Sequence, residues 1–262
     1  MLNVRVVKIG GNELDRPEWV AACARALSTG GPAVVVHGGG QAVSTWSHRL
    51  GLPVEKRDGL RVTTPEIAQL VEMVLGGPIN RTLVTALRAA GLDAIGLSGV
   101  DGGLLTAQPL QNGTELGEVG EIVNVRASLL QSLLLAGLTP VVAPVAPSLV
   151  APARPLNVNA DQAAAAIAAA LNAQELLFVS DVPGVTVDGI TQPTLAAAEI
   201  ETLIEGGVAT GGMAAKLRAA AQALGAGVRA VRIGDLDMFE HATAGTRLLA
   251  VPPASTPATQ PA

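Results

Sequence analysis

Short, uninterrupted apolar runs along the chain alternate with longer stretches of helical pattern. Runs that are apolar without alternation are typical of strands buried on both faces of a sheet. Such runs predict strands at Val4–Ile9, Ala33–His37, Ala94–Ser98, Thr139–Ala143, Leu176–Ser180 and Ala230–Ile233. Helices are predicted between them at Pro17–Ser28, Gln41–Leu50, Pro65–Leu75, Ile79–Ala90, Ala127–Ala136, Asp161–Leu171, Leu195–Ile204 and Met213–Leu224. This alternation predicts an α/β fold with a mostly parallel central sheet and helices on both faces.

Three segments depart from this rhythm. Residues 103–124 hold several glycines, the pair Asn112-Gly113 and little helical pattern, which predicts a β-hairpin. Residues 251–262 are rich in proline, threonine and alanine and are predicted to be a disordered tail. The uncharged stretch Ala127–Ala153 could suggest a membrane span. Its four prolines would break a helix repeatedly, so a helix to about Ala136 followed by a buried strand is favoured, and no membrane association is predicted.

Composition narrows the function classes. Hydrophobic residues make up 49% of the 262 residues and charged residues 15%, which suits a globular enzyme with a deeply buried sheet. A net charge of −5 and 2% aromatic residues argue against a nucleic-acid partner, which needs basic surfaces and stacking platforms. The single Cys23 and three scattered histidines lack metal-ligand spacing, so no metal site is predicted. The chain enters a strand at once, without a signal-peptide pattern, which predicts a cytoplasmic protein.

The first candidate for chemistry is a strand that ends in Lys8 and is followed by Gly10 and Gly11. Glycine lets the backbone approach an anion and direct its N–H groups at it, and a lysine adds a point charge. An ordinary strand-end turn with a solvated lysine is the alternative interpretation of this fragment.

The second candidate is the run His37-Gly38-Gly39-Gly40 between a strand and a helix. Free N–H groups and the dipole at a helix start favour a phosphate or carboxylate. A dinucleotide fingerprint would need a third glycine at the Val43 position. A lipase-type hydrolase would need G-x-S-x-G, and the segment 96–100 fails at Val100. An anion site is therefore the favoured interpretation.

Three further segments lie at predicted strand ends or helix starts. The run Asn157-Val158-Asn159-Ala160-Asp161 precedes an alanine-rich helix and could supply helix caps or functional groups. The run Ser180–Gly184 follows a strand, where open α/β sheets bind ligands, although a plain Pro-Gly turn explains it equally. The run Thr210–Lys216 places a glycine pair and a lysine at a helix start, which suits phosphate; a flexible loop with a surface lysine is the alternative.

The lysine count sharpens these interpretations. The chain has 14 arginines but only three lysines, Lys8, Lys56 and Lys216. Two of the three stand beside glycine pairs, which a composition so poor in lysine would rarely produce by chance. A compact ammonium is also the natural phosphate partner where a forked guanidinium would not fit.

Taken in order, these five segments resemble the amino acid kinase family, over about residue 4 to Ala250. Within that family the resemblance is closest to the N-acetylglutamate kinases, on Asp58–Thr63 followed by Glu72–Leu75 and on Asn157–Asp161. It implies a three-layer αβα sandwich with two lobes. Residues 1–174 would bind the acyl amino acid and dimerise, and residues 175–250 would bind the nucleotide.

The resemblance also implies roles for individual residues. The catalytic residues would be Lys8 and Lys216, which stabilise the transferring phosphoryl group, and Asp161, which orients both lysines. The substrate-binding residues would be Gly39, Gly40, Arg61 and Asn157, with Arg61 clamping the α-carboxylate. The nucleotide-binding residues would be Lys8, Gly10, Gly11, Ser180, Asp181, Gly184, Thr210, Gly211, Met213 and Lys216. Pro78 departs from the family pattern, where a polar residue is common.

The implied reaction fits the residue inventory. A carboxylate with a pKa of about 4.3 is already ionised at neutral pH and needs no general base to attack phosphorus. ATP with Mg²⁺ would be the co-substrate, with no prosthetic group. Kinases of lysine synthesis, acting on a free or carrier-linked aminoadipate group, are the nearest alternative, and a non-catalytic nucleotide-binding regulator is a remote one. A carrier-linked substrate favours a basic docking surface, whereas residues 103–124 contain three glutamates and no lysine or arginine.

The expected oligomeric state comes from the same resemblance. Members of the family that are inhibited by arginine carry an extra helix ahead of the first strand. Here that strand is predicted to begin by Val4. The expectation is therefore a homodimer that is insensitive to arginine.

Overall fold

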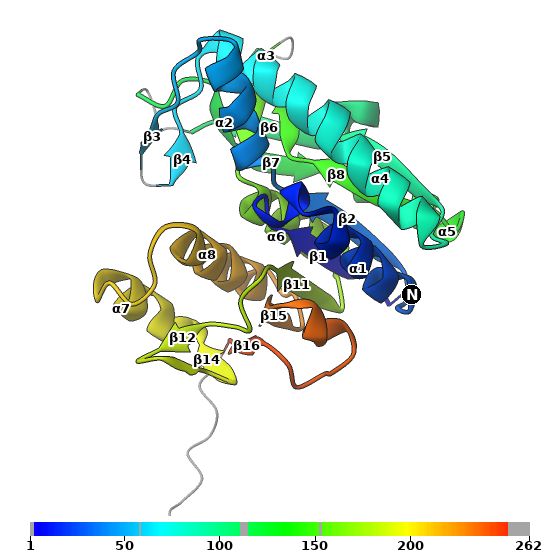
Figure 1. The fold of residues 1–262 in the computed structure, drawn as a ribbon, viewed down its shortest axis with the longest axis vertical. Coiled ribbons are helices and arrows are strands. Elements are labelled where there is room, and N and C mark those ends of the chain that lie inside the picture. Colours follow the sequence, from blue (N-terminus) through cyan, green and yellow to red (C-terminus); the bar gives the residue numbers. More distant parts are fainter. Residues whose placement is uncertain (1–2, 58, 111–114, 152–153, 251–262) are drawn as a thin grey trace, which may run out of the picture.

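The computed structural model of the chain describes residues 3–57, 59–110, 115–151 and 154–250. Within these residues, an eight-stranded sheet runs through the molecule in the order β14-β16-β15-β11-β1-β2-β8-β5 (Figure 1). Its strands are β1 Arg5–Ile9, β2 Ala33–His37, β5 Ala94–Ser98, β8 Thr139–Ala143, β11 Glu175–Val179, β14 Thr194–Ala196, β15 Val231–Gly234 and β16 Thr246–Leu249. Neighbouring strands are parallel except for β15 and β16. The six strands predicted from the apolar runs are confirmed to within one residue at either end.

Helices cover both faces of this sheet. Because successive strand residues point to opposite faces, β1 divides its side chains between two cores. Val7 and Ile9 pack with α1 (Pro17–Ser28) and α4 (Asn80–Ala89). Val6 packs into the other core, with α5 (Ala127–Leu135), α6 (Ala160–Ala170) and α8 (Gly211–Gly225). The predicted three-layer αβα sandwich is confirmed, and its division into two lobes stays a prediction.

A smaller sheet stands beside the main one, in the order β6-β7-β10-β9. Its strands are β6 Leu105–Pro109, β7 Val119–Val125, β9 Val145–Pro147 and β10 Pro155–Val158. The antiparallel pairing of β6 with β7 confirms the predicted hairpin. The Asn112-Gly113 pair, Asp58 and the predicted tail 251–262 lie outside the described residues.

Two helices and a short hairpin lie over the carboxyl ends of β2 and β8. Helices α2 (Gly40–Arg49) and α3 (Pro65–Val74) share an apolar core with Ala143 and Val145. The segments β3 (Lys56–Arg57) and β4 (Leu60–Arg61) form a hairpin between these two helices in the chain. A π-helical turn over Leu75–Ile79, with Pro78 inside it, joins α3 to α4.

The predicted helix Leu195–Ile204 is wrong at its start. Residues Thr194–Ala196 form β14, which pairs in parallel with β16. Leu195 is buried in the core, and the Glu199 side chain accepts the Ala196 N–H at 2.8 Å, which opens a 3-10 turn. The helix α7 covers only Ile200–Glu205, and an antiparallel pair, β12 (Thr186–Val187) and β13 (Ile190–Thr191), precedes this region.

The uncharged stretch after Arg126 forms α5, then β8 and β9. The prediction of a helix followed by a buried strand is thus confirmed. Among the described residues, every helix is too short or too polar to cross a membrane.

Candidate active site

The carboxyl ends of three neighbouring strands define one edge of the sheet. Strand β1 pairs in register with both neighbours, so that Ile9 lies opposite His37 of β2 and Val179 of β11. The sheet continues through β2 to one side of β1 and through β11 to the other. Ligands of open α/β sheets bind outside the carboxyl ends of the strands at such a switch point. The predicted glycine loops and Ser180 therefore meet here.

The two glycine loops touch each other. A Cβ atom on Gly11 would lie 2.7 Å from the backbone nitrogen of Gly39, and one on Gly39 would lie 2.5 Å from Cδ2 of Leu75. Gly39 has a φ of 151°, which side-chain-bearing residues rarely adopt. The Gly10 N–H donates to the Val179 carbonyl at 3.2 Å, whereas within the described residues no acceptor meets the N–H groups of Gly11, Gly39 and Gly40. Three backbone donors are therefore available to an anion.

Lys8 and Asp161 form a buried ion pair. Lys8 Nζ lies 2.7 Å from Asp161 Oδ1, and the two side chains are 6% and 9% exposed. Asp161 lies in the first turn of α6, and Asn159 is the N-cap of that helix. The Asn159 Oδ1 accepts hydrogen bonds from the N–H groups of Asp161 and Gln162, at 2.8 and 3.2 Å. The polar run Asn157–Asp161 thus contains both a helix cap, Asn159, and a charged residue of the candidate site, Asp161.

Lys216 brings a second ammonium into the same electrostatic environment. It is half-buried in α8, and burial, followed by the charge of Lys8, lowers its pKa below the ordinary lysine value. The carboxylates of Asp161, Glu13 and Asp181 oppose this shift. Two like charges held together in a partly desolvated position are stabilised when a polyphosphate binds between them.

A cavity of about 240 Å³ opens beside the ion pair. Its lining includes the predicted catalytic residues Lys8 and Asp161 and the predicted substrate-binding residues Gly39, Gly40, Arg61 and Asn157, together with Gly11. The third predicted catalytic residue, Lys216, is not part of this lining. The structure thus brings together, around one cavity, residues that are far apart in the sequence.

Arg61 also lines this cavity, and it is only 7% exposed. Its Nη2 donates to the Gly40 carbonyl at 2.8 Å and to Ser44 Oγ at 2.7 Å. Its Nη1 is buried and meets no acceptor in the part of the chain that the structure describes. Burial lowers the pKa of this guanidinium. An incoming carboxylate would pair the free donor and offset the cost of burying the charge.

Asn157, on β10, also lines the cavity. Strand β10 runs parallel to β7, with Asn157 opposite Val119, which also lines the cavity. The Asn157 Nδ2 donates to Thr63 Oγ1 at 3.1 Å. This bond fixes the amide and leaves its carbonyl oxygen for a donor on the ligand.

The other predicted nucleotide-binding residues lie outside this lining. Ser180 follows β11 with its Oγ buried, and no partner for that atom is found among the described residues. A Cβ on Gly184 would lie 2.6 Å from Thr246 Oγ1, which also accepts the Val185 N–H at 2.8 Å. Thr210 is the N-cap of α8, followed by Gly211 with a φ of 52° and, one turn into the helix, by the half-buried Met213. These residues surround the β11 end and the α8 start, on the Lys216 side of the site.

Two features of the site were missed from the sequence. Glu13 is 4% exposed, and its carboxylate occupies the space that a side chain on Gly10 would need. It lies two residues after the glycine pair, but a lone glutamate in a loop carries no signal of burial. The second feature is the contact between His37 and Asn80, at 3.1 Å, which joins β2 to α4. Among the described residues, no group of three or more His, Cys, Asp or Glu side chains is placed to hold a metal ion.

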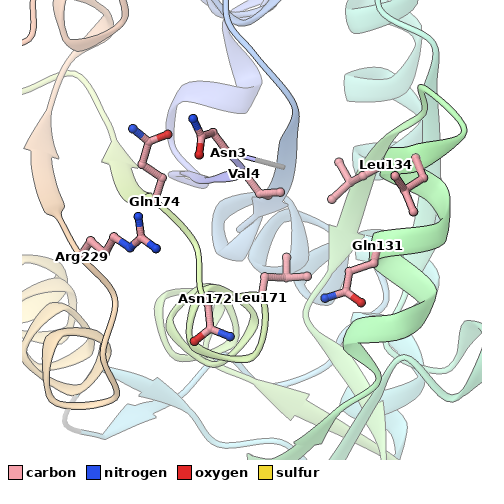
Figure 2. Close-up of a pocket in the computed structure, with 9 residues that line it drawn as sticks. Asn3, Val4, Gln131, Leu134, Leu171, Asn172, Gln174 and Arg229 are labelled. Carbon is pink, nitrogen blue, oxygen red and sulfur yellow. The ribbon is translucent and has the colours of Figure 1, made fainter. Parts of the chain in front are cut away.

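A second cavity, of about 350 Å³, lies at the opposite edge of the sheet (Figure 2). Val4 leads into β1 there, Arg229 comes just before β15, and Asn172 follows α6. It contains none of the predicted site residues.

Comparison with known proteins gives consistent matches over most of the chain. A sequence profile described as "Amino acid kinase family" matches residues 3–235. The acetylglutamate kinase of Chloroflexus aggregans is 47% identical over 238 residues, covering 90% of this chain and 93% of the relative. The acetylglutamate kinase of Geobacillus kaustophilus is 43% identical over 242 residues, covering 91% and 93%.

Solved structures share the fold. The protein smu.665 of Streptococcus mutans superposes with a TM-score of 0.84 at 29% identity, covering 96% of this chain and all of the other. The carbamate kinase of Giardia lamblia bound to AMP-PNP superposes with a TM-score of 0.72 at 15% identity, covering 94% and 98%. At that identity the second likeness shows the fold alone.

Proposed function

The chain belongs to the amino acid kinase family, and on that premise we propose that it uses ATP to phosphorylate the side-chain carboxylate of N-acetyl-L-glutamate. The observation that carries this proposal is the cavity whose lining brings the Lys8–Asp161 pair and three free backbone donors together with Arg61. The similarity to acetylglutamate kinases over about nine-tenths of the chain supports the choice of substrate.

The chemistry needs positioning and charge neutralisation more than proton transfer. The attacking carboxylate is ionised at neutral pH, so it requires no general base. Lys8 and Lys216 offset the negative charge that spreads over the phosphoryl oxygens in the transition state. The N–H groups of Gly11, Gly39 and Gly40 hold the same oxygens without reorganisation. Asp161 keeps the Lys8 ammonium in place.

Recognition of the substrate is assigned to Arg61 and Asn157. Arg61 binds the α-carboxylate of the acyl amino acid through its free Nη1, and the Asn157 carboxamide binds the neighbouring polar groups. With the α-carboxylate fixed there, the side-chain carboxylate reaches toward the glycine loops and Lys8.

The nucleotide is assigned to the Lys216 side. ATP arrives with Mg²⁺, which phosphate oxygens largely hold. Lys8, Gly10 and Gly11 contact its phosphates, and the residues around the β11 end and the α8 start hold the rest of it, with residues 175–250 as the nucleotide lobe. The assignment of the nucleotide to this side rests on Lys216, whose charged form is disfavoured by burial and by the charge of Lys8. A bound polyphosphate would stabilise that charged form.

The same proposal includes a homodimer in the cytoplasm, formed through residues 1–174. It rests on the family membership alone, because the site described above is complete within one chain.

Acyl-phosphate formation tests the function directly. The purified protein, ATP and Mg²⁺ are incubated with N-acetylglutamate, N-acetyl-aminoadipate, glutamate or aspartate, and the acyl phosphate is trapped with hydroxylamine. We expect a clear preference for N-acetylglutamate. Preference for the longer substrate, or turnover only with a carrier protein, would instead assign the enzyme to lysine synthesis. No turnover with any acyl amino acid would reject the kinase assignment.

Replacing Arg61 with alanine tests the substrate clamp. We expect KM for N-acetylglutamate to rise by about 100-fold, with kcat changed by less than about five-fold, because the guanidinium binds a part of the substrate that does not react. KM for ATP should stay unchanged. Ser44→Ala, which removes one hydrogen-bond acceptor of Arg61 and keeps the guanidinium, serves as the matched control. An unchanged KM for the acyl substrate in Arg61→Ala would reject the clamp.

A further inference from the structure

A chain of hydrogen bonds runs from α4 to the glycine run after β2. Arg81 donates to Asn80 Oδ1 at 2.8 Å, and Asn80 Nδ2 donates to the Val141 carbonyl at 2.9 Å. The same Nδ2 lies 3.1 Å from His37 Nε2, and His37 Nδ1 lies 2.8 Å from the Gly38 carbonyl oxygen. His37 and Asn80 are fully buried.

These partners determine the protonation of His37. An arginine only donates and a carbonyl only accepts, so the Asn80 amide can be oriented in one way, with its NH₂ group toward Val141 and His37. The Asn80 NH₂ group, which also lies 3.4 Å from the Leu97 carbonyl, cannot accept a proton from His37 Nε2, whereas the Gly38 carbonyl beside Nδ1 can only accept one. The single proton of the neutral imidazole is therefore placed on Nδ1. The Nδ1–H then donates to the Gly38 carbonyl. Full burial, together with the charge of Lys8, lowers the pKa of His37 to about 4, which agrees with a neutral ring.

The direction of the Gly38 carbonyl sets the direction of the next N–H group. A trans peptide is planar, and its C=O and N–H point to opposite sides. His37 shares its face of β2 with Val35, which packs toward α1 and α4, whereas Lys8 on β1 faces the α6 side. When the imidazole holds the Gly38 carbonyl on the α4 side, the Gly39 N–H is turned to the cavity.

We propose that His37, fixed by Asn80, is a positioning residue that locks the Gly38–Gly39 peptide so that the Gly39 N–H faces the transferring phosphoryl group. His37 is not among the residues that line the cavity. It acts through the peptide, whose carbonyl it also polarises, which strengthens the N–H on the other side. Gly39 has no side chain to restrict its backbone, so the Gly38–Gly39 peptide could otherwise rotate. The hydrogen bond from His37 therefore has a positioning effect in addition to the packing that any buried histidine provides. The catalytic consequence rests on the proposed kinase function, whereas the geometry does not.

The tautomer is tested first, without reference to activity. The chain contains three histidines, so a ¹⁵N-histidine-labelled full-length protein gives few imidazole signals. The signal that disappears in His37→Asn belongs to His37. At pH 7.5 we expect that ring to be neutral with its proton on Nδ1. A proton on Nε2, or a charged ring, would overturn the proposal even if the protein is an active kinase.

Two substitutions of the same residue then separate positioning from packing. In His37→Asn the side-chain amide keeps a donor near the position of Nδ1, whereas in His37→Gln the polar atoms lie near the position of Nε2 and a methylene replaces the Nδ1 donor. We expect kcat to fall by about 100-fold in His37→Gln and by less than about five-fold in His37→Asn, with little change in KM for N-acetylglutamate. Both variants lose the packing of the imidazole ring, so their melting temperatures should fall by similar amounts.

The outcomes distinguish the two proposals. Equal losses of kcat in both variants, in step with their loss of stability, would show that His37 only fills the core. A near-normal kcat in His37→Gln would also overturn the positioning role. If the unaltered protein phosphorylates no acyl amino acid, the proposed function fails, while the tautomer measurement still decides whether the peptide lock exists.

Discussion

Lys8→Ala is expected to lower kcat by about 1000-fold while changing KM for either substrate by less than about five-fold. The reason is that the Lys8 ammonium pairs with Asp161 and lines the same cavity as the glycine loops, where the proposed reaction develops charge only during transfer. The same change leaves a buried carboxylate without its counter-ion, which costs about 3 kcal/mol of folding free energy. Steady-state kinetics and thermal melting measure the two effects on one preparation.

Two further variants separate the loss of charge from the loss of fold. Lys8→Arg keeps a positive charge next to Asp161 but replaces a compact ammonium by a larger planar group. It should recover much of the melting temperature and little of kcat. Lys8→Ala combined with Asp161→Ala removes the unpaired carboxylate and should recover stability without activity. A near-normal kcat in Lys8→Ala would mean that this lysine has no part in phosphoryl transfer.

The interior of the fold could be predicted because its strands are buried on both faces. Every residue of β2 and of β8 is buried, so both show as continuous apolar runs. The small sheet could not be predicted in the same way, since β9 and β10 are only three and four residues long and contain Pro147 and Pro155. Such segments have the composition of loops, and they form strands only because β7 offers β10 a partner and β10 in turn pairs with β9.

Candidate site residues could be proposed from the sequence, but not their pairings. Lysines and glycine pairs at strand and helix ends mark an anion site locally, whereas the contact of Lys8 with Asp161 depends on how α6 packs on β1. The sequence also could not show that the Gly10 N–H donates to the Val179 carbonyl of β11 and is therefore not free for a ligand. Asn80 gave no signal because a single asparagine near a helix start is ordinary, and its partner His37 belongs to a distant strand.

Lys216→Ala is expected to lower kcat by about 1000-fold as well, but with the opposite effect on the stability of the free protein. Burial and the charge of Lys8 lower the pKa of Lys216, so its charged form is disfavoured by folding at neutral pH. Removing it should leave the melting temperature of the free enzyme unchanged or slightly raised, whereas Lys8→Ala lowers it. The stabilisation that ATP and Mg²⁺ give the unaltered protein should shrink in Lys216→Ala. A normal kcat would contradict the role of this lysine.

The same shift predicts a pH dependence. Because its pKa in the folded protein is lowered, the Lys216 ammonium loses its proton at a lower pH than an exposed lysine does. The value of kcat/KM for ATP should therefore begin to decline at a lower alkaline pH than the titration of an exposed lysine would cause. Lys216→Arg keeps its charge throughout this range, because a guanidinium does not deprotonate there. Its activity should be lower, since the fork fits the phosphate less well, but its alkaline decline should be absent or moved to higher pH. An identical decline in Lys216→Arg and in the unaltered enzyme would assign the ionisation to another group.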